Sequence, residues 1–139
     1  MTLTLALQTQ TKHLKRDLSV KVGLASPSIL LVEHAGESQQ HHLHLLRLLN
    51  CKVDLATSGK QALTLSTQAY DLILMDTHLP DLCGFEVSKR IKAKHPMMRI
   101  PIIALTQQHH TPKQSHVDEL VAKPVSPEKL ISILTRWIH

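Results

Sequence analysis

The sequence predicts an α/β fold in which five parallel strands form a doubly wound sheet with helices on both faces. Short apolar runs at residues 29–32, 72–75 and 100–105 are typical of strands that are covered on both sides. The stretches between them carry apolar residues three and four positions apart, which indicates amphipathic helices. Strands that alternate with helices form a parallel sheet through right-handed crossovers. Because Phe, Tyr and Trp occur once each, the core must be aliphatic.

The chain of 139 residues has the length of one domain, which we expect at residues 28–139. Residues 1–27 are expected to be an N-terminal extension or linker. Within them, residues 2–11 alternate apolar and polar side chains, which predicts a strand, and a charged stretch with Gly23 and Pro27 follows.

The first half of the domain predicts two strand–helix units, with strands at residues 29–32 and 53–56. In the first helix, the core-facing stripe is His42, Leu45, Leu46 and Leu49, and the polar face holds Gln39, Gln40 and Arg47. The cluster of His41, His42 and His44 is interpreted as a polar helix face rather than a ligand set. Ser58 and Gln61 form a capping-box pattern, which predicts that a second helix begins there.

The second half predicts three further strands, at residues 72–75, 100–105 and 120–122. A helix carrying Val87 and Ile91 follows the first of them and ends at Pro96. Residues 107–122 leave room for little helix, so the fourth helix is expected to be shortened or lost. Ser126 predicts the N-cap of the last helix, and its stripe is Leu130, Ile133, Leu134 and Trp137.

Charge and composition exclude several classes of protein. The net charge of +5 comes from scattered basic residues with few aromatics, so no nucleic-acid binding is expected. Cys51 and Cys83 show no paired spacing, which favours a reducing, cytoplasmic setting. No apolar run approaches the roughly 20 residues of a membrane helix, so no membrane contact by this domain is expected.

Reactive side chains follow the predicted strands at one edge of the sheet. Glu33 and His34 follow the first strand, Asp76 the third, Thr106 the fourth and Lys123 the fifth. Ligands of open α/β sheets bind at this carboxyl edge. A carboxylate can attack a phosphoryl donor and form an acyl phosphate when positive charge offsets the phosphoryl oxygens. Lys123 can supply part of that charge.

From Ser28 to about His139 the chain resembles the receiver domain of response regulators in two-component signalling. The most specific part is DLILMDTHLPDLCGFE, residues 71–86, and IPIIALT and AKP follow in the family's order. The resemblance implies the flavodoxin-like (βα)5 receiver fold. It also implies a partner, a histidine kinase or a histidine phosphotransfer protein. No independent catalytic domain is expected in this chain.

The resemblance assigns a role to each residue at the carboxyl edge. Asp76 would accept a phosphoryl group from a phosphohistidine, assisted by Mg²⁺. Thr106 and Lys123 would bind the phosphoryl group and report its presence. The metal ligands would be Glu33, Asp76 and the backbone of His78.

The chain departs from the family at position 34, where His34 stands in place of the usual second acid. Because Mg²⁺ prefers oxygen ligands, the magnesium site is expected to be weakened or lost. A transition-metal site built from His34, His78 and either His109 or His110 is a further hypothesis. Leu120 occupies the place of a switch aromatic that many relatives carry.

Two functions from different classes therefore remain open. In the first, the chain is a phosphorelay receiver, either a single-domain regulator or the terminal receiver of a hybrid sensor kinase. The short match of TLTLAL to the last strand of a kinase ATP-binding domain favours the hybrid kinase. In the second, it is a degenerate pseudo-receiver that binds a partner protein without phosphorylation.

Overall fold

The computed structural model describes residues 26–97, 99–107 and 116–138, which contain five strands and four helices. The strands are β1 (Ser28–Val32), β2 (Lys52–Ala56), β3 (Leu72–Asp76), β4 (Ile102–Thr106) and β5 (Glu119–Ala122). The helices are α2 (Glu37–Leu48), α3 (Gly59–Leu65), α4 (Gly84–Lys94) and α5 (Pro127–Trp137). This is the doubly wound five-stranded fold that the sequence predicted.

All five strands run parallel, in the order β2-β1-β3-β4-β5. The chain moves outward from β1 to β2 and then crosses back over β1 to β3. The winding direction therefore changes between β1 and β3, and ligand crevices of such sheets lie beyond the strand ends at this point. In the register of the sheet, Asp76 of β3 pairs with Leu105 of β4, and Thr106 is the next residue along β4. The ends of the two strands therefore bring Asp76 and Thr106 close together.

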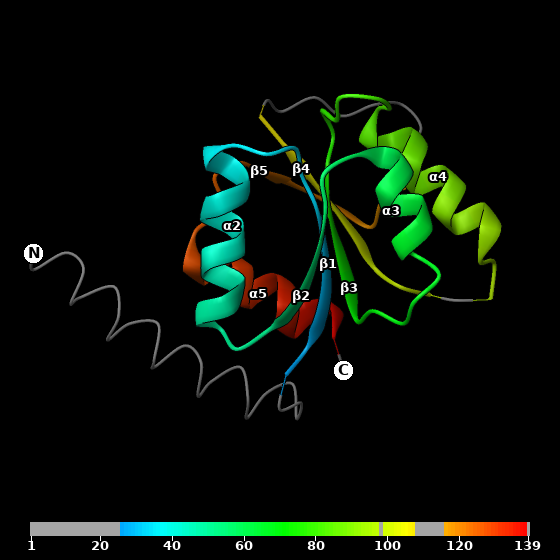
Figure 1. The fold of residues 1–139 in the computed structure, drawn as a ribbon. Coiled ribbons are helices and arrows are strands. Elements are labelled where there is room, and N and C mark those ends of the chain that lie inside the picture. The colour runs from blue at the N-terminus through cyan, green and yellow to red at the C-terminus, as the bar shows by residue number, and fades with distance from the viewer. Residues whose placement is uncertain (1–25, 98, 108–115, 139) are drawn as a thin grey trace, which may run out of the picture.

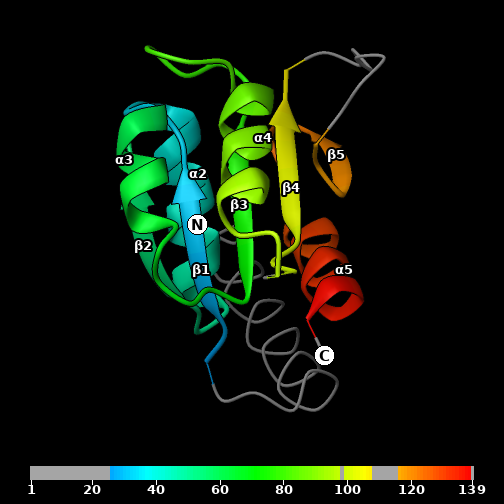
Figure 2. The same cartoon turned by 90° about the vertical axis from the view of Figure 1, so that its right-hand side faces the viewer.

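The sheet lies between two helical layers. Helices α2 and α5 cover one face and α3 and α4 cover the other, as Figure 1 shows in profile and Figure 2 shows from the α3–α4 side. Strand β1 alternates accordingly: Ile29 and Leu31 pack toward α2 and α5, and Leu30 and Val32 toward α3 and α4. Burial on both faces explains why this strand is an uninterrupted apolar run.

The predicted helix starts are confirmed by their hydrogen bonds. The Ser58 hydroxyl accepts from the Gln61 amide at 3.2 Å, and the Gln61 side chain accepts from the Thr57 amide at 2.8 Å. Ser126 caps α5 by accepting from the Lys129 amide at 3.1 Å. Such caps satisfy amide donors that have no partner inside the helix.

Two expectations for α2 and β4 need correction. Gln39 is buried rather than on an exposed polar face. His42 is buried, as its place on the core-facing stripe predicted, and so does not share a polar face with His41 and His44, which are exposed. Both buried side chains have polar partners near β1, which compensate for their removal from water. Strand β4 begins at Ile102, two residues after the predicted start, and the Pro101 carbonyl before it accepts from the Ile73 amide.

Some predictions fall outside the described residues. These include the strand at residues 2–11 and most of the segment expected to hold the shortened fourth helix. Within the described residues, Cys51 and Cys83 are free thiols. Among the helices described, none combines the length and apolarity needed to cross a membrane.

Candidate functional site

A buried cluster of two acids and one lysine lies at the carboxyl edge of the sheet. Lys123 follows β5, and its Nζ lies 3.1 Å from Asp76 Oδ2 and 3.4 Å from Glu33 Oε2. The three side chains are 8%, 5% and 1% exposed. Because isolated buried charges are very unfavourable, the lysine and the two carboxylates stabilise one another. The structure thus brings together three of the residues that the sequence singled out.

Glu33 is held by several donors of the chain itself. Its Oε1 accepts from Nδ1 of His42 at 2.8 Å, and its Oε2 accepts from the Ser38 hydroxyl. The Glu33 carbonyl accepts from the Gln39 amide group at 2.8 Å. Burial would raise the pKa of Glu33, but the hydrogen bonds from His42 and Ser38 and the charge of Lys123 outweigh it. The pKa therefore lies below its ordinary value.

His42 connects this acid to the segment before α5. The backbone amide of Val125 donates to Nε2 of His42 at 3.3 Å, so the ring hydrogen lies on Nδ1, facing Glu33. Its neighbour His41 donates from Nε2 to the Val125 carbonyl at 2.9 Å. Two consecutive residues of α2 therefore bind both backbone groups of Val125.

Asp76 is oriented from three sides. Its Oδ2 faces Lys123, and its Oδ1 accepts from the His78 amide at 3.0 Å. The first residue of α4, Gly84, packs directly on the Asp76 backbone, because a Cβ at Gly84 would lie 2.1 Å from the Asp76 carbonyl oxygen. Only glycine allows this approach.

The loop after Asp76 is fixed to the neighbouring helix by Asp81. Its carboxylate accepts from the Gly59 amide at 2.8 Å and the Lys60 amide at 3.0 Å, at the start of α3. These backbone hydrogen bonds lower the pKa of Asp81 from its ordinary value. The loop that carries His78 runs from β3 to α4 and is held in between by the contact of Asp81 with the start of α3.

The remaining predicted site residues lie around this cluster in different settings. Thr106 ends β4 and is buried, and its carbonyl accepts from the Lys123 amide at 2.7 Å. His34 and His78 have exposed side chains. Within the described residues, no hydrogen bond or ion pair joins the His34 ring to another side chain. The position of the second acid therefore contributes no carboxylate oxygen to the cluster.

The donor set does not fit a strong magnesium site. Mg²⁺ takes oxygen ligands in near-octahedral geometry. Both oxygens of Glu33 and both of Asp76 already accept hydrogen bonds or contact Lys123, and His34 offers nitrogen. A cation would have to displace the lysine or these donors.

The histidine-based metal site also has no support in the part of the chain that the structure describes. There, no group of three or more His, Cys, Asp and Glu residues is placed to hold a metal ion. His109 and His110, which completed that hypothesis, lie outside the described residues.

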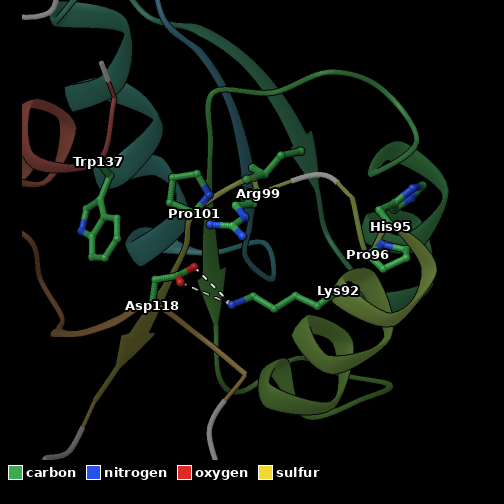
Figure 3. A pocket seen from close by; sticks show the side chains of 8 residues that line it. Lys92, His95, Pro96, Arg99, Pro101, Asp118 and Trp137 are labelled. Carbon is green, nitrogen blue, oxygen red and sulfur yellow. Dashed lines mark hydrogen bonds and ion pairs between the residues drawn. The ribbon is translucent and has the colours of Figure 1, made fainter.

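Two surface cavities of similar size differ in their relation to the cluster. One, of about 390 Å³, opens beside Lys123 and is lined by Glu37, Ser38, His41, Gln107, Lys123 and Pro124. The other, of about 410 Å³, lies at the opposite end of the strands (Figure 3). There Lys92 pairs with Asp118 at 3.3 Å, and Trp137 and two prolines line the wall. Of these two cavities, only the first is lined by a residue of the cluster, Lys123.

Sequence reasoning missed the roles of Ser38, His42 and Val125. One signal was present: His42 lies on a helix stripe that otherwise contains leucines, and a polar side chain facing a core needs a partner. The identity of that partner depends on how α2 packs beside the end of β1.

Comparison with known proteins gives consistent matches. A family model of the response regulator receiver domain matches residues 29–135. The aerobic respiration control sensor protein ArcB of Escherichia coli strain K12 is 30% identical over 120 residues, covering 82% of this chain but 15% of ArcB. The polar-differentiation response regulator DivK of Brucella ovis is 27% identical over 117 residues, covering 80% of this chain and 95% of DivK.

Solved structures agree with the sequence matches. The receiver domain of the sensor histidine kinase PA1611 from Pseudomonas aeruginosa PAO1, which has a magnesium ion coordinated in its active site cleft, superposes with a TM-score of 0.76. It is 38% identical and covers 82% of this chain and 98% of its own. Full-length ShkA, in complex with AMPPNP, gives a TM-score of 0.73 at 34% identity, over 82% of this chain and 24% of ShkA. With its strand order and its acid–lysine cluster, the chain belongs to the response regulator receiver domain family of two-component signalling.

Proposed function

We propose that this receiver accepts a phosphoryl group on Asp76 from a phosphohistidine of a histidine kinase or a histidine phosphotransfer protein. The observation that carries the proposal is the contact of Lys123 with Asp76 at 3.1 Å between two buried side chains. A buried ammonium group beside the acceptor offsets the charge of an incoming phosphoryl group where the solvent screens it little.

The phosphoryl transfer forms one bond to phosphorus and breaks another. A carboxylate oxygen of Asp76 attacks phosphorus in line with the phosphorus–nitrogen bond of the phosphohistidine. The oxygen–phosphorus bond forms as the phosphorus–nitrogen bond breaks, and the histidine leaves with the electron pair and takes up a proton. Lys123 then pairs with the phosphoryl oxygens, and the Thr106 hydroxyl donates to another of them. Movement of these two residues would carry the signal to β5 and α5.

The magnesium site of this receiver is proposed to be weakened or lost. The PA1611 receiver domain has magnesium in its cleft. Here, by contrast, Glu33 is engaged by its own chain and His34 supplies no oxygen ligand. Phosphoryl transfer should therefore depend more on Lys123 than it does where a cation is firmly bound.

One observation favours a second function, that of a pseudo-receiver. Both carboxylates of the cluster are satisfied by donors of the chain itself. A fold with this closed charge network can bind a partner protein without any phosphoryl transfer. The two functions differ in whether Asp76 is ever modified.

We infer that residues 28–139 act as the receiver unit of a larger signalling system in the cytoplasm. ArcB is a sensor protein and PA1611 a sensor histidine kinase, which supports the terminal receiver of a hybrid kinase. The match to the response regulator DivK covers 95% of that protein, which supports the alternative that this chain is a single-domain regulator. Residues 1–27 would then be a linker or an extension.

Transfer from a phosphorylated histidine phosphotransfer protein tests the proposal. After mixing, we expect the label to appear on the wild-type chain and not on Asp76→Asn, which removes the nucleophile without changing its size. Thr77→Val, at the neighbouring buried position, is the matched control and should still accept the label. A label that also appears on Asp76→Asn would show a different acceptor, and a wild-type chain that never takes the label would favour the pseudo-receiver.

A further inference from the structure

We propose that His42 is a positioning residue that joins Glu33 to the segment before α5 and thereby withholds Glu33 from cation binding. This inference deepens the proposed function, because Glu33 and Lys123 belong to the proposed site. Its decisive measurements are nevertheless made on the unphosphorylated protein, so they do not depend on phosphoryl transfer.

The geometry around the imidazole is fully buried and directional. His42 is 1% exposed, and each ring nitrogen has one partner: Glu33 Oε1 at 2.8 Å and the Val125 amide at 3.3 Å. These partners lie 9 and 83 residues away along the chain. One side chain of α2 therefore connects the end of β1 with the beginning of α5.

Val125 lies between Lys123 and the start of α5, so the hydrogen bond from its amide to His42 fixes the segment that carries the lysine. Val125 is buried, stands two residues after Lys123 and directly precedes Ser126, the N-cap of α5. Its carbonyl is bound by His41, so neither of its backbone groups can turn freely. The lysine that pairs with both acids is thus attached to the same segment that His42 fixes.

The same contact determines what Glu33 can do. Its Oε1 is occupied by His42, and its Oε2 by Ser38 and Lys123. A hydrogen bond from a fixed, buried donor to a charged carboxylate is strong, and the carboxylate cannot rotate toward a ligand without losing it. Glu33 therefore serves as a structural anchor within the charge network.

A competing explanation is that His42 merely fills space in the core. The two explanations differ in which substitution restores the wild-type behaviour. His42→Leu keeps apolar volume but has no donor or acceptor. In His42→Gln, the side chain has a different shape but still carries both a hydrogen-bond donor and an acceptor. His44→Leu changes an exposed histidine of the same helix and is the matched control.

The first measurement is hydrogen exchange of the Val125 amide by NMR. We expect exchange to be at least about tenfold faster in His42→Leu, largely restored in His42→Gln and unchanged in His44→Leu. The second is a magnesium titration of the same proteins, in which His42→Leu should bind Mg²⁺ at least about tenfold more tightly than the wild type. Unchanged Val125 exchange or unchanged magnesium affinity in His42→Leu overturns the proposal, as does His42→Gln behaving like His42→Leu.

A direct observation on the wild type covers the case in which His42→Leu does not fold. The ¹⁵N spectrum of the imidazoles reports which ring nitrogen carries hydrogen. Hydrogen on Nδ1 of His42, with Nε2 coupled to the Val125 amide, supports the connection, and hydrogen on Nε2 overturns it. If these results hold while Asp76 takes up no phosphoryl group, the positioning role stands and the proposed phosphoryl transfer alone is wrong.

Discussion

At the scale of single residues, the chemistry of this receiver depends on one ammonium group placed between two buried carboxylates. Lys123 reaches Asp76 and Glu33 from the segment after β5, so the charges of three strand ends meet at one point. Loss of the cation would leave two acids close together with little solvent to screen them.

Replacing Lys123 by methionine should therefore destabilise the fold by about 3 kcal/mol near neutral pH, because it leaves buried charges unpaired. The loss should shrink at acid pH, because the charge of Lys123 helps to lower the pKa of Glu33 and this contribution disappears once that carboxylate is protonated. Urea unfolding at the two pH values measures both effects. The same substitution in an Asp76→Asn background should cost less, and an equal cost in both backgrounds would contradict the account.

The residues predicted from the sequence were those fixed by their position after a strand. Glu33, Asp76, Thr106 and Lys123 all lie at the carboxyl edge, since parallel strands bring their carboxyl ends to one side. His42 could not be assigned in this way, because its partners come from the packing of a helix against two distant segments. Helix periodicity gives the face of a residue and not the atom that it meets.

At the scale of elements, the start of α4 determines where Asp76 lies. Gly84 contacts the Asp76 carbonyl, and its amide donates to the Thr77 carbonyl at 3.0 Å. The contact is with backbone, which cannot move aside as a flexible side chain does.

Gly84→Ala should therefore destabilise the protein by about 3 kcal/mol or more and displace Asp76 from Lys123. Cys83→Ala, at the exposed neighbouring position, should change stability by less than about 0.5 kcal/mol. Denaturant unfolding gives both values. Wild-type stability in Gly84→Ala would show that α4 does not press on the acceptor strand.

Strand β5 and helix α5 are joined through Glu119. This side chain accepts from the indole of Trp137 at 2.8 Å and pairs with Arg136 and Lys129. Burial would raise the pKa of Glu119, but the hydrogen bond from Trp137 and the two cations lower it below the ordinary value of 4.5. The lowered pKa means that the folded state favours the charged carboxylate.

A folded-state pKa below the unfolded one gives stability at higher pH that is lost as the pH falls through the folded value. Between about pH 6 and pH 3, the wild type should therefore lose more stability than Glu119→Gln, by about 1 kcal/mol or less because the group is partly screened. Urea unfolding followed by Trp137 fluorescence measures the difference. If the wild type and Glu119→Gln lost stability identically between these pH values, the pKa of Glu119 would not be lowered by folding.

Elements with regular patterns were predicted closely, and those that depend on tertiary contacts were not. The caps at Ser58 and Ser126 followed from local sequence, since the partner of each is three residues away. The start of β4 was misplaced because Ile100 and Pro101 continue the apolar run before the paired residues Ile102–Thr106, although the Pro101 carbonyl still accepts from the Ile73 amide of β3. The apolar character of Ile100 reflects its packing against the core rather than membership of the strand.

At the scale of the whole molecule, two apolar layers on either side of the sheet should make residues 26–139 fold independently. The described residues near the cut are anchored, since the Pro27 carbonyl accepts from the Lys52 amide at 2.8 Å. A chain that begins at Ser26 should therefore melt within about 4 °C of the full chain, in one cooperative transition. Loss of cooperative melting would show that residues 1–25 belong to the folded unit.

The proposed signalling role requires Asp76 to be a working phosphoryl acceptor despite the altered position 34. Intact-protein mass after incubation with acetyl phosphate and Mg²⁺ tests this most directly, on the wild type, Asp76→Asn and His34→Asp. We predict a phosphoryl adduct on the wild type that is absent from Asp76→Asn and forms faster in His34→Asp, where a second acid is restored. An adduct that forms only in His34→Asp, with none on the wild type, would contradict the account and show a receiver fold whose phosphoryl chemistry has been lost.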